Sequence, residues 1–173
     1  LVNLQTGEAK LVLSVAQGRS LMPAPKEVPG KPGNPLAYYC HTVISKDGRK
    51  IFFLARSVDW FDAANHTAAK HHTTSFTVNR DGSDLRRCFP DGWGGSHFNW
   101  APDGSHRLLV TTPIPGNRWP SLVEFEVGQE AACRRIGAGV LDQDWHCVYS
   151  PDGEFMSGEA YPNGNNDRCW QLV

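Results

Sequence analysis

The sequence lacks several features that identify common classes of protein. Apolar runs such as residues 51–55 are far shorter than the roughly 20 residues that a membrane-spanning helix needs, so we expect no membrane partner. Neither charge is in excess, with 17 Lys and Arg against 18 Asp and Glu, which argues against a nucleic-acid partner. No Gly-x-Ser-x-Gly element, P-loop or dinucleotide-binding fingerprint occurs, so the sequence indicates neither a hydrolase nucleophile nor a nucleotide site of those types.

The five cysteines are not spaced like metal ligands. No Cys-x-x-Cys pair occurs among them, which argues against a structural zinc site. Their odd number and irregular spacing favour free, buried thiols, with one or two disulfides left open. The sequence starts at Leu1 without a signal-peptide pattern, so it does not define a compartment. The cytoplasm or periplasm of a bacterium is our expectation.

What the sequence does contain is an internal repeat. Three segments begin with a histidine and end in Asp-Gly, and they start at His41, His97 and His146. Each indicates a short strand followed by a tight turn, in which Gly supplies a positive φ, and an apolar strand follows the turn. A second strand–turn–strand pattern follows, so one unit of roughly 40–50 residues is a four-stranded antiparallel sheet with the size of a β-propeller blade.

The repeat predicts an all-β fold, a β-propeller of which about three to four blades lie in this sequence. We expect an outer half-blade over residues 1–18, a proline-rich insertion over 19–36, blades over 37–92 and 93–141, and an incomplete blade over 142–173. A propeller needs about four to eight blades to close its ring. We therefore expect the remaining blades of the same parent chain, or another chain, as partners.

Two resemblances follow from these residues. The Ser-Pro-Asp-Gly turn resembles that of the WD40-like propellers typified by the TolB C-terminal domain. More narrowly, residues 41–44, 78–84, 96–105 and 145–162 look like successive blades of the oligogalacturonate lyase family, whose members are seven-bladed propellers. The second resemblance covers most of the chain and implies an activity.

Enzymes of that family cleave oligogalacturonides, the breakdown products of pectin, by β-elimination. The resemblance implies a divalent cation, Mn²⁺ in the family, that polarises the uronate carboxylate, and a histidine that removes a proton. Carried over onto this sequence, His97 is a metal ligand and His41 the candidate base.

The family's other metal ligands lie in a Gln-x-x-His-x-His element. Gln143 and His146 fit its first half, but Val148 stands where the last histidine belongs. A better register places this element beyond Val173 and the catalytic arginine before Leu1. On that register the chain carries only part of the site.

An acidic glycan needs cations that bind carboxylates, and arginine does this best. Arg56, at the end of a predicted inner strand, and Arg118, in a loop, are the candidates, and Trp93 could stack on a sugar ring. The alternative for the two arginines is an ordinary surface position, and the alternative for Trp93 and the repeated histidines is a purely architectural role.

The leading hypothesis is therefore a metal-dependent lyase acting on oligogalacturonides, with an incomplete site in this chain. One alternative is a non-catalytic TolB-like propeller that binds a protein or glycan. Another is the propeller of a larger peptidase, whose hydrolase domain these residues do not include.

Overall fold

Regular structure in this chain is almost entirely β-strand. The computed structural model describes residues 1–31, 35–65, 67–68, 71–89, 95–113, 121–139, 141 and 145–160. The strands are β1 (Leu36–Ile44), β2 (Lys50–Val58), β3 (Phe61–Asp62), β4 (Thr67–Ala68), β5 (His71–Asn79), β6 (Arg86–Arg87), β7 (Ser96–Trp100), β8 (Arg107–Thr112), β9 (Ser121–Glu126), β10 (Arg134–Arg135), β11 (Trp145–Tyr149) and β12 (Met156–Ala160). The helical elements are α1 (Val15–Arg19) and the 3-10 turn η1 (Glu130–Ala132). Among the described residues, no helix has the length and hydropathy of a membrane span.

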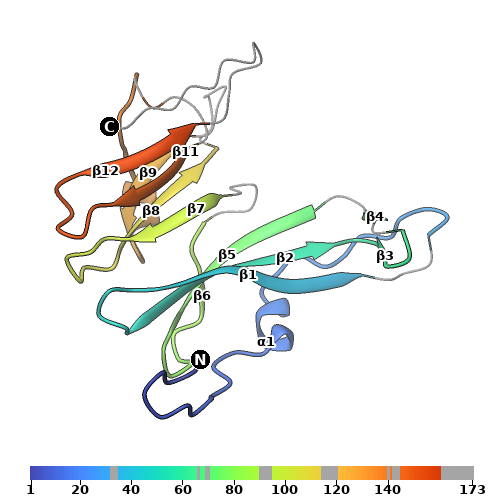
Figure 1. Cartoon of the computed structure of the whole chain (residues 1–173). Coiled ribbons are helices and arrows are strands. Elements are labelled where there is room, and N and C mark those ends of the chain that lie inside the picture. Colours follow the sequence, from blue (N-terminus) through green and yellow to red (C-terminus); the bar gives the residue numbers. More distant parts are fainter. Residues whose placement is uncertain are drawn as a thin grey trace.

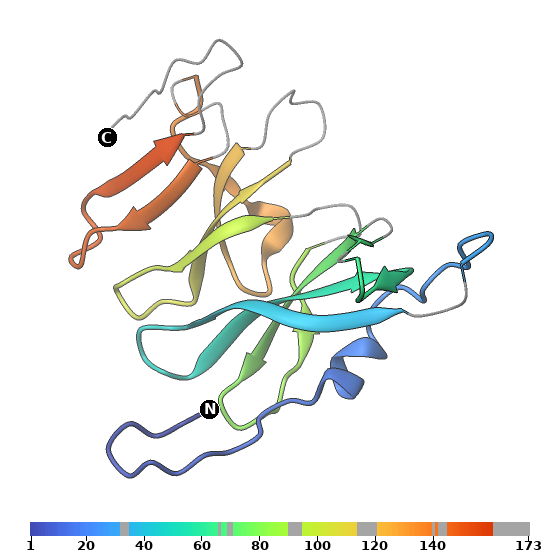
Figure 2. The same cartoon turned by 45° about the vertical axis from the view of Figure 1, so that its right-hand side comes forward.

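The strands form sheets of the kind that the repeat predicts. One sheet has the order β1-β2-β5-β6 and another the order β7-β8-β9-β10, and all the pairings are antiparallel. Strands β11 and β12 start a third sheet. The first strands of the three sheets lie side by side, with β7 between β1 and β11 (Figures 1 and 2). This is how successive blades stand in a propeller, so the predicted all-β, propeller-type fold is confirmed.

The Asp-Gly turns have the predicted geometry. Gly48, Gly104 and Gly153 follow the first strands of the three sheets and have positive φ angles of 69°, 79° and 78°. The aspartate before each glycine accepts a hydrogen bond from the backbone N–H two residues on. Short Asp side chains stabilise such turns locally, so these acidic residues have an architectural role.

Successive side chains of a strand point to opposite faces of the sheet, and on the central strands apolar side chains are buried on both faces. Phe52 and Leu54 on β2 pack toward the second sheet, against Phe98 on β7 and Leu108 on β8. The side chain between Leu108 and Val110, Leu109, points the other way and packs with Cys147 on β11. The core therefore lies between successive sheets, as blade packing requires.

The N-terminal region covers the outer face of the first sheet. Residues 1–10 make a turn closed by the isolated bridge between Val2 and Ala9, and helix α1 follows. Val12, Leu13 and Met22 then pack against a cluster on the outer face of β2 and β5. The sequence did not predict α1, although Ser14 and Gln17 form a capping box at its start.

The predicted blade limits stay predictions, because the ends of the blades fall partly outside the described residues. The insertion between β2 and β5 contains the small hairpin β3–β4. Of the cysteines, Cys40 and Cys133 are free thiols, Cys88 and Cys147 are buried, and Cys169 lies outside the described residues.

Candidate functional site

Two of the repeated histidines occupy the same unusual backbone position. His41 and His97 have φ angles of 53° and 57°, which are uncommon for residues other than glycine. Each lies where the strand pairing shifts register, between Cys40 and Val43 in β1 and between Ser96 and Asn99 in β7. Such bulges redirect side chains and are frequent near functional sites. The repeat in sequence is therefore also a repeat in local backbone geometry.

His97 and His146 lie against each other across two blades. Their ring centroids are 3.7 Å apart, with the rings tilted by 59°. The pair forms because β7 and β11 are neighbouring inner strands (Figure 1). Both side chains are partly buried, so the two imidazoles are partly shielded from water.

A carboxylate orients one ring of this pair. His146 Nδ1 lies 2.9 Å from Oε1 of Glu159, the residue directly opposite on β12. With the proton on Nδ1 donated to the carboxylate, the lone pair of the ring is on Nε2. Carboxylates hold metal-binding histidines in this way. Glu159 was not predicted, and the signal for it was the hairpin register that places it opposite His146.

His41, the candidate base, stands apart from this pair. Its side chain is exposed. With the described residues it makes no hydrogen bond, ion pair or ring contact. It shares the bulge geometry of His97 but not its surroundings. A proton-transfer role for His41 stays a prediction.

Arg56 is half-buried on β2, where it lies opposite Tyr38 on β1 and Thr73 on β5. It is close enough to Cys40 for its charge to act on that thiol. Burial raises the pKa of Cys40, and the positive charge of Arg56 offsets only part of that rise. A neutral thiol therefore lies beside a cationic side chain at the start of the bulge in β1.

The remaining predicted site residues, Trp93, Arg118 and Gln143, lie outside the described residues. Within the described ranges, no group of three or more His, Cys, Asp and Glu side chains is arranged to hold a metal ion. Of the residues that the resemblance names as metal ligands, only His97 and His146 lie in the described ranges, so a metal site there would need further ligands.

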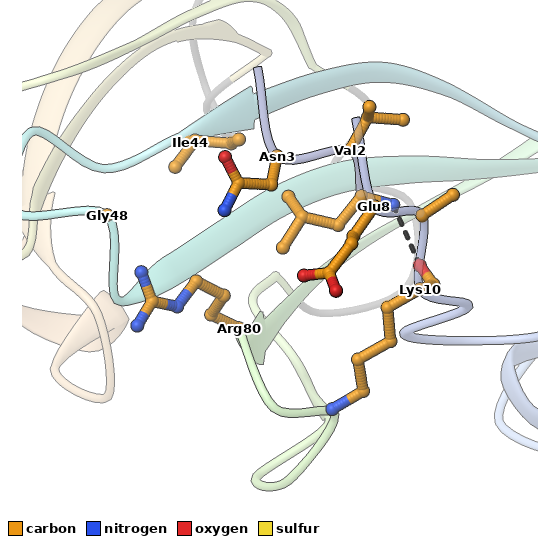
Figure 3. Close-up of a pocket in the computed structure, with 9 residues that line it drawn as sticks. Val2, Asn3, Glu8, Lys10, Ile44, Gly48 and Arg80 are labelled. Atoms are coloured by element: carbon orange, nitrogen blue, oxygen red, sulfur yellow. Dashed lines mark hydrogen bonds between the residues drawn. The ribbon is translucent and has the colours of Figure 1, made fainter. Parts of the chain in front are cut away.

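An open cavity of about 840 Å³ lies elsewhere, between residues 1–10 and the turn end of the first sheet. Figure 3 shows Glu8, Lys10 and Arg80 around it, beside the hydrogen bond of 2.9 Å from the Leu1 amino group to the Lys10 carbonyl. No histidine lines it. It is therefore separate from the candidate site on the inner strands.

Comparison with known proteins gives limited further information. No family model matches the sequence, and no curated protein matches it. Among solved structures, the chain is similar to the crystal structure of TolB from Acinetobacter baumannii, with 13% identity and a TM-score of 0.45. The match covers 75% of this chain and 39% of that chain, so this chain spans well under half of its length. Neither the family models nor the curated proteins support the narrower resemblance to oligogalacturonate lyases.

Proposed function

We propose that the inner strands of this propeller-type chain form part of a site for an acidic glycan, in a metal-dependent lyase that cleaves oligogalacturonides by β-elimination. The observation that carries the proposal is the contact between the His97 and His146 rings, with Glu159 orienting the second ring. Two adjacent imidazoles from different blades, one of them held by a carboxylate, are an arrangement suited to a divalent cation. The resemblance in sequence supplies the reaction.

The side chains have distinct roles in this proposal. Nitrogen atoms of His97 and His146 bind the cation, and Glu159 keeps the His146 ring in one orientation. A cation bound there supplies a positive charge that polarises the uronate carboxylate and lowers the barrier to losing the C5 proton.

His41 is the proposed base. Imidazole titrates close to neutral pH, so a neutral ring can accept a proton under ordinary conditions. His41 takes the C5 proton, the C5–H electron pair becomes the C4–C5 double bond, and the bond from C4 to the glycosidic oxygen breaks. That oxygen leaves with the electron pair and takes up a proton from water, and His41 releases the C5 proton to solvent, which gives a shortened oligosaccharide and an unsaturated uronate.

Metal binding tests the proposal on the chain itself. Titration with Mn²⁺, followed by electron paramagnetic resonance of the free ion, should reveal a site in the wild type that both His97→Ala and His146→Ala abolish. His71→Ala is the matched control, because His71 is exposed at the start of β5, and it should bind as the wild type does.

If Mn²⁺ binding is absent or unchanged in both variants, the lyase proposal is wrong. If galacturonate binds equally well with a chelator and no metal site is found, the non-catalytic glycan-binding alternative takes its place. Formation of the unsaturated uronate, followed by its ultraviolet absorbance, adds direct support where metal binding is found.

A further inference from the structure

Three polar side chains form a row across the first sheet. Tyr38 on β1, Arg56 on β2 and Thr73 on β5 are direct partners in the strand register. Residues directly opposite each other in antiparallel strands project from the same face of the sheet. A phenol, a guanidinium and a hydroxyl group therefore lie side by side on one face of the sheet. Arg56 is two residues beyond Leu54 on β2, so the row borders the apolar contact with the second sheet.

The row is half-buried and makes no polar contact of its own. The side chains of Tyr38, Arg56 and Thr73 have no hydrogen bond or ion pair anywhere in the described chain, and all three are partly buried. By comparison, the partly buried Arg107 pairs with two carboxylates, those of Asp103 and Glu124. A partly desolvated guanidinium without an anion is unfavourable, so an incoming carboxylate gains both charge and hydrogen bonds there.

The surroundings do not compete for the guanidinium. Cys40, diagonal to Arg56, stays neutral at neutral pH because burial raises the pKa of its thiol. Asp59 lies further along the chain and is engaged by His72 Nε2 at 3.0 Å and by the backbone N–H of Lys26 at 2.8 Å. Among the described residues, the Arg56 side chain is thus left without a neighbouring anion on this part of the sheet.

The row suits a sugar acid in particular. Arginine donates two parallel hydrogen bonds to a planar carboxylate, and the two hydroxyl groups at its sides can donate to or accept from sugar hydroxyls. Tyr38 precedes His41 by three residues on the same strand, which at about 3.3 Å per residue is about 10 Å. An oligosaccharide could span the row and the bulge together.

We propose that Tyr38, Arg56 and Thr73 form a subsite that binds the carboxylate of an acidic sugar. Arg56 holds the carboxylate, and the two hydroxyl groups orient the sugar ring around it. The subsite takes its ligand class from the proposed function, but it needs no metal ion. The two proposals can therefore fail separately.

The test is a titration of the full chain with galacturonate in the presence of a chelator, followed by NMR chemical shifts. Galactose, of the same size without the charge, and inorganic phosphate, an anion without the sugar, are the comparison ligands. The wild type should bind galacturonate in preference to both. Arg56→Gln should weaken binding about tenfold or more, because a hydrogen-bonded charge is lost.

Variants with smaller changes sharpen the assignment. Arg56→Lys keeps the charge but loses the two-pronged geometry, so its affinity should fall between those of Arg56→Gln and the wild type. Tyr38→Phe and Thr73→Val should each cost about two- to tenfold, the value of a neutral hydrogen bond. Arg80→Gln, which removes an exposed arginine in the turn directly after β5, should bind as the wild type does.

The outcomes separate cleanly. The subsite is wrong if a folded Arg56→Gln chain binds galacturonate normally, or if galactose or phosphate binds as well as galacturonate. Should Arg56→Gln fail to fold, as judged by circular dichroism, the Tyr38 and Thr73 variants decide the question in the same way. Galacturonate binding without any Mn²⁺ site leaves the subsite standing and removes the lyase, whereas an Mn²⁺ site without galacturonate binding does the reverse.

Discussion

The contact between the first and second sheets is filled mainly with apolar side chains, with one exposed ion pair between His106 and Asp47 at its turn end, whereas the contact between the second sheet and β11 places a buried carboxylate beside a smaller apolar cluster. In the first contact, the rings of Phe52 and Phe98 lie 4.2 Å apart, and Trp100 Nε1 donates to the Val43 carbonyl oxygen at 3.1 Å. In the second, a smaller apolar cluster lies beside the carboxylate of Glu124. One repeated unit thus joins its neighbours by two different kinds of interaction.

Glu124 is the centre of the second contact. Its side chain is only 8% exposed, and it accepts hydrogen bonds from Arg107 Nη1 at 3.2 Å, Arg134 Nη2 at 2.8 Å and the Tyr149 hydroxyl at 2.5 Å. Burial by itself raises the pKa of Glu124, but the Tyr149 and Arg134 hydrogen bonds and the Arg107 charge outweigh it, so that this pKa is lowered. The carboxylate is therefore ionised at neutral pH and ties β9 to β11.

The two contacts should respond differently to pH and to salt concentration. Burial of apolar area is insensitive to pH and only weakly sensitive to low salt, whereas charged hydrogen bonds depend on both. We therefore expect the two contacts to be distinguishable by mutation and by pH.

The largest expected effect is in the apolar contact. Phe52→Ala removes a fully buried ring and leaves a cavity between the sheets, so the free energy of unfolding should fall by about 3–5 kcal/mol. Denaturant unfolding followed by circular dichroism measures it. Phe155→Ala is the matched control, because Phe155 is 69% exposed in the turn after β11, and it should change stability little. Equal effects of the two substitutions would contradict the assignment of the core.

Glu124→Gln should have the next largest effect. The amide keeps the shape but removes the charge that two arginines and Tyr149 share, so we expect a loss of about 1–3 kcal/mol at neutral pH. The figure is below that of a fully buried pair because the Arg107 side chain is 40% exposed and can be hydrated. Unfolding of the two proteins at equal ionic strength gives the difference.

The pH dependence of this difference is a sharper test. The pKa of Glu124 is lowered in the folded chain from its ordinary value of 4.5, so its contribution is present above pH 4.5 and is lost as the pH falls towards the folded value. The gap in stability between wild type and Glu124→Gln should therefore shrink on acidification below pH 4.5. Other carboxylates titrate in both proteins and cancel in the difference. A gap that stays constant would show that the charge of Glu124 does not hold the contact.

Much of this fold is predictable because its signals are local. The Asp-Gly turns and the short apolar run at residues 51–55 depend only on neighbours in sequence, and they predicted the sheets. Helix α1 also has a local signal, the capping box of Ser14 and Gln17, but this signal overlaps the strand–turn–strand pattern over residues 1–18. Local rules therefore sufficed except where two of them competed.

The candidate site depends on information that one segment does not contain. That His97 and His146 occupy equivalent positions is readable from the repeat, but their ring contact depends on how closely β7 and β11 pack. The row of Tyr38, Arg56 and Thr73 depends on the register of strands β1, β2 and β5. Tyr38 precedes the bulge at His41, whereas the turn that joins β1 to β2 follows it. Because a bulge changes which residues share a face, the row could not be counted from the sequence.

The smallest expected effect lies at the rim of the charged contact. Arg134 donates to the same carboxylate as Arg107, but its side chain is 68% exposed, so water replaces much of what Arg134→Gln removes. We expect a loss of about 0–1 kcal/mol, which moderate salt abolishes. Denaturant unfolding of wild type and variant at low and at moderate salt measures both values. A loss as large as that of Glu124→Gln, unchanged by salt, would mean that Arg134 is part of the buried contact and that the charged interface extends to the edge strand β10.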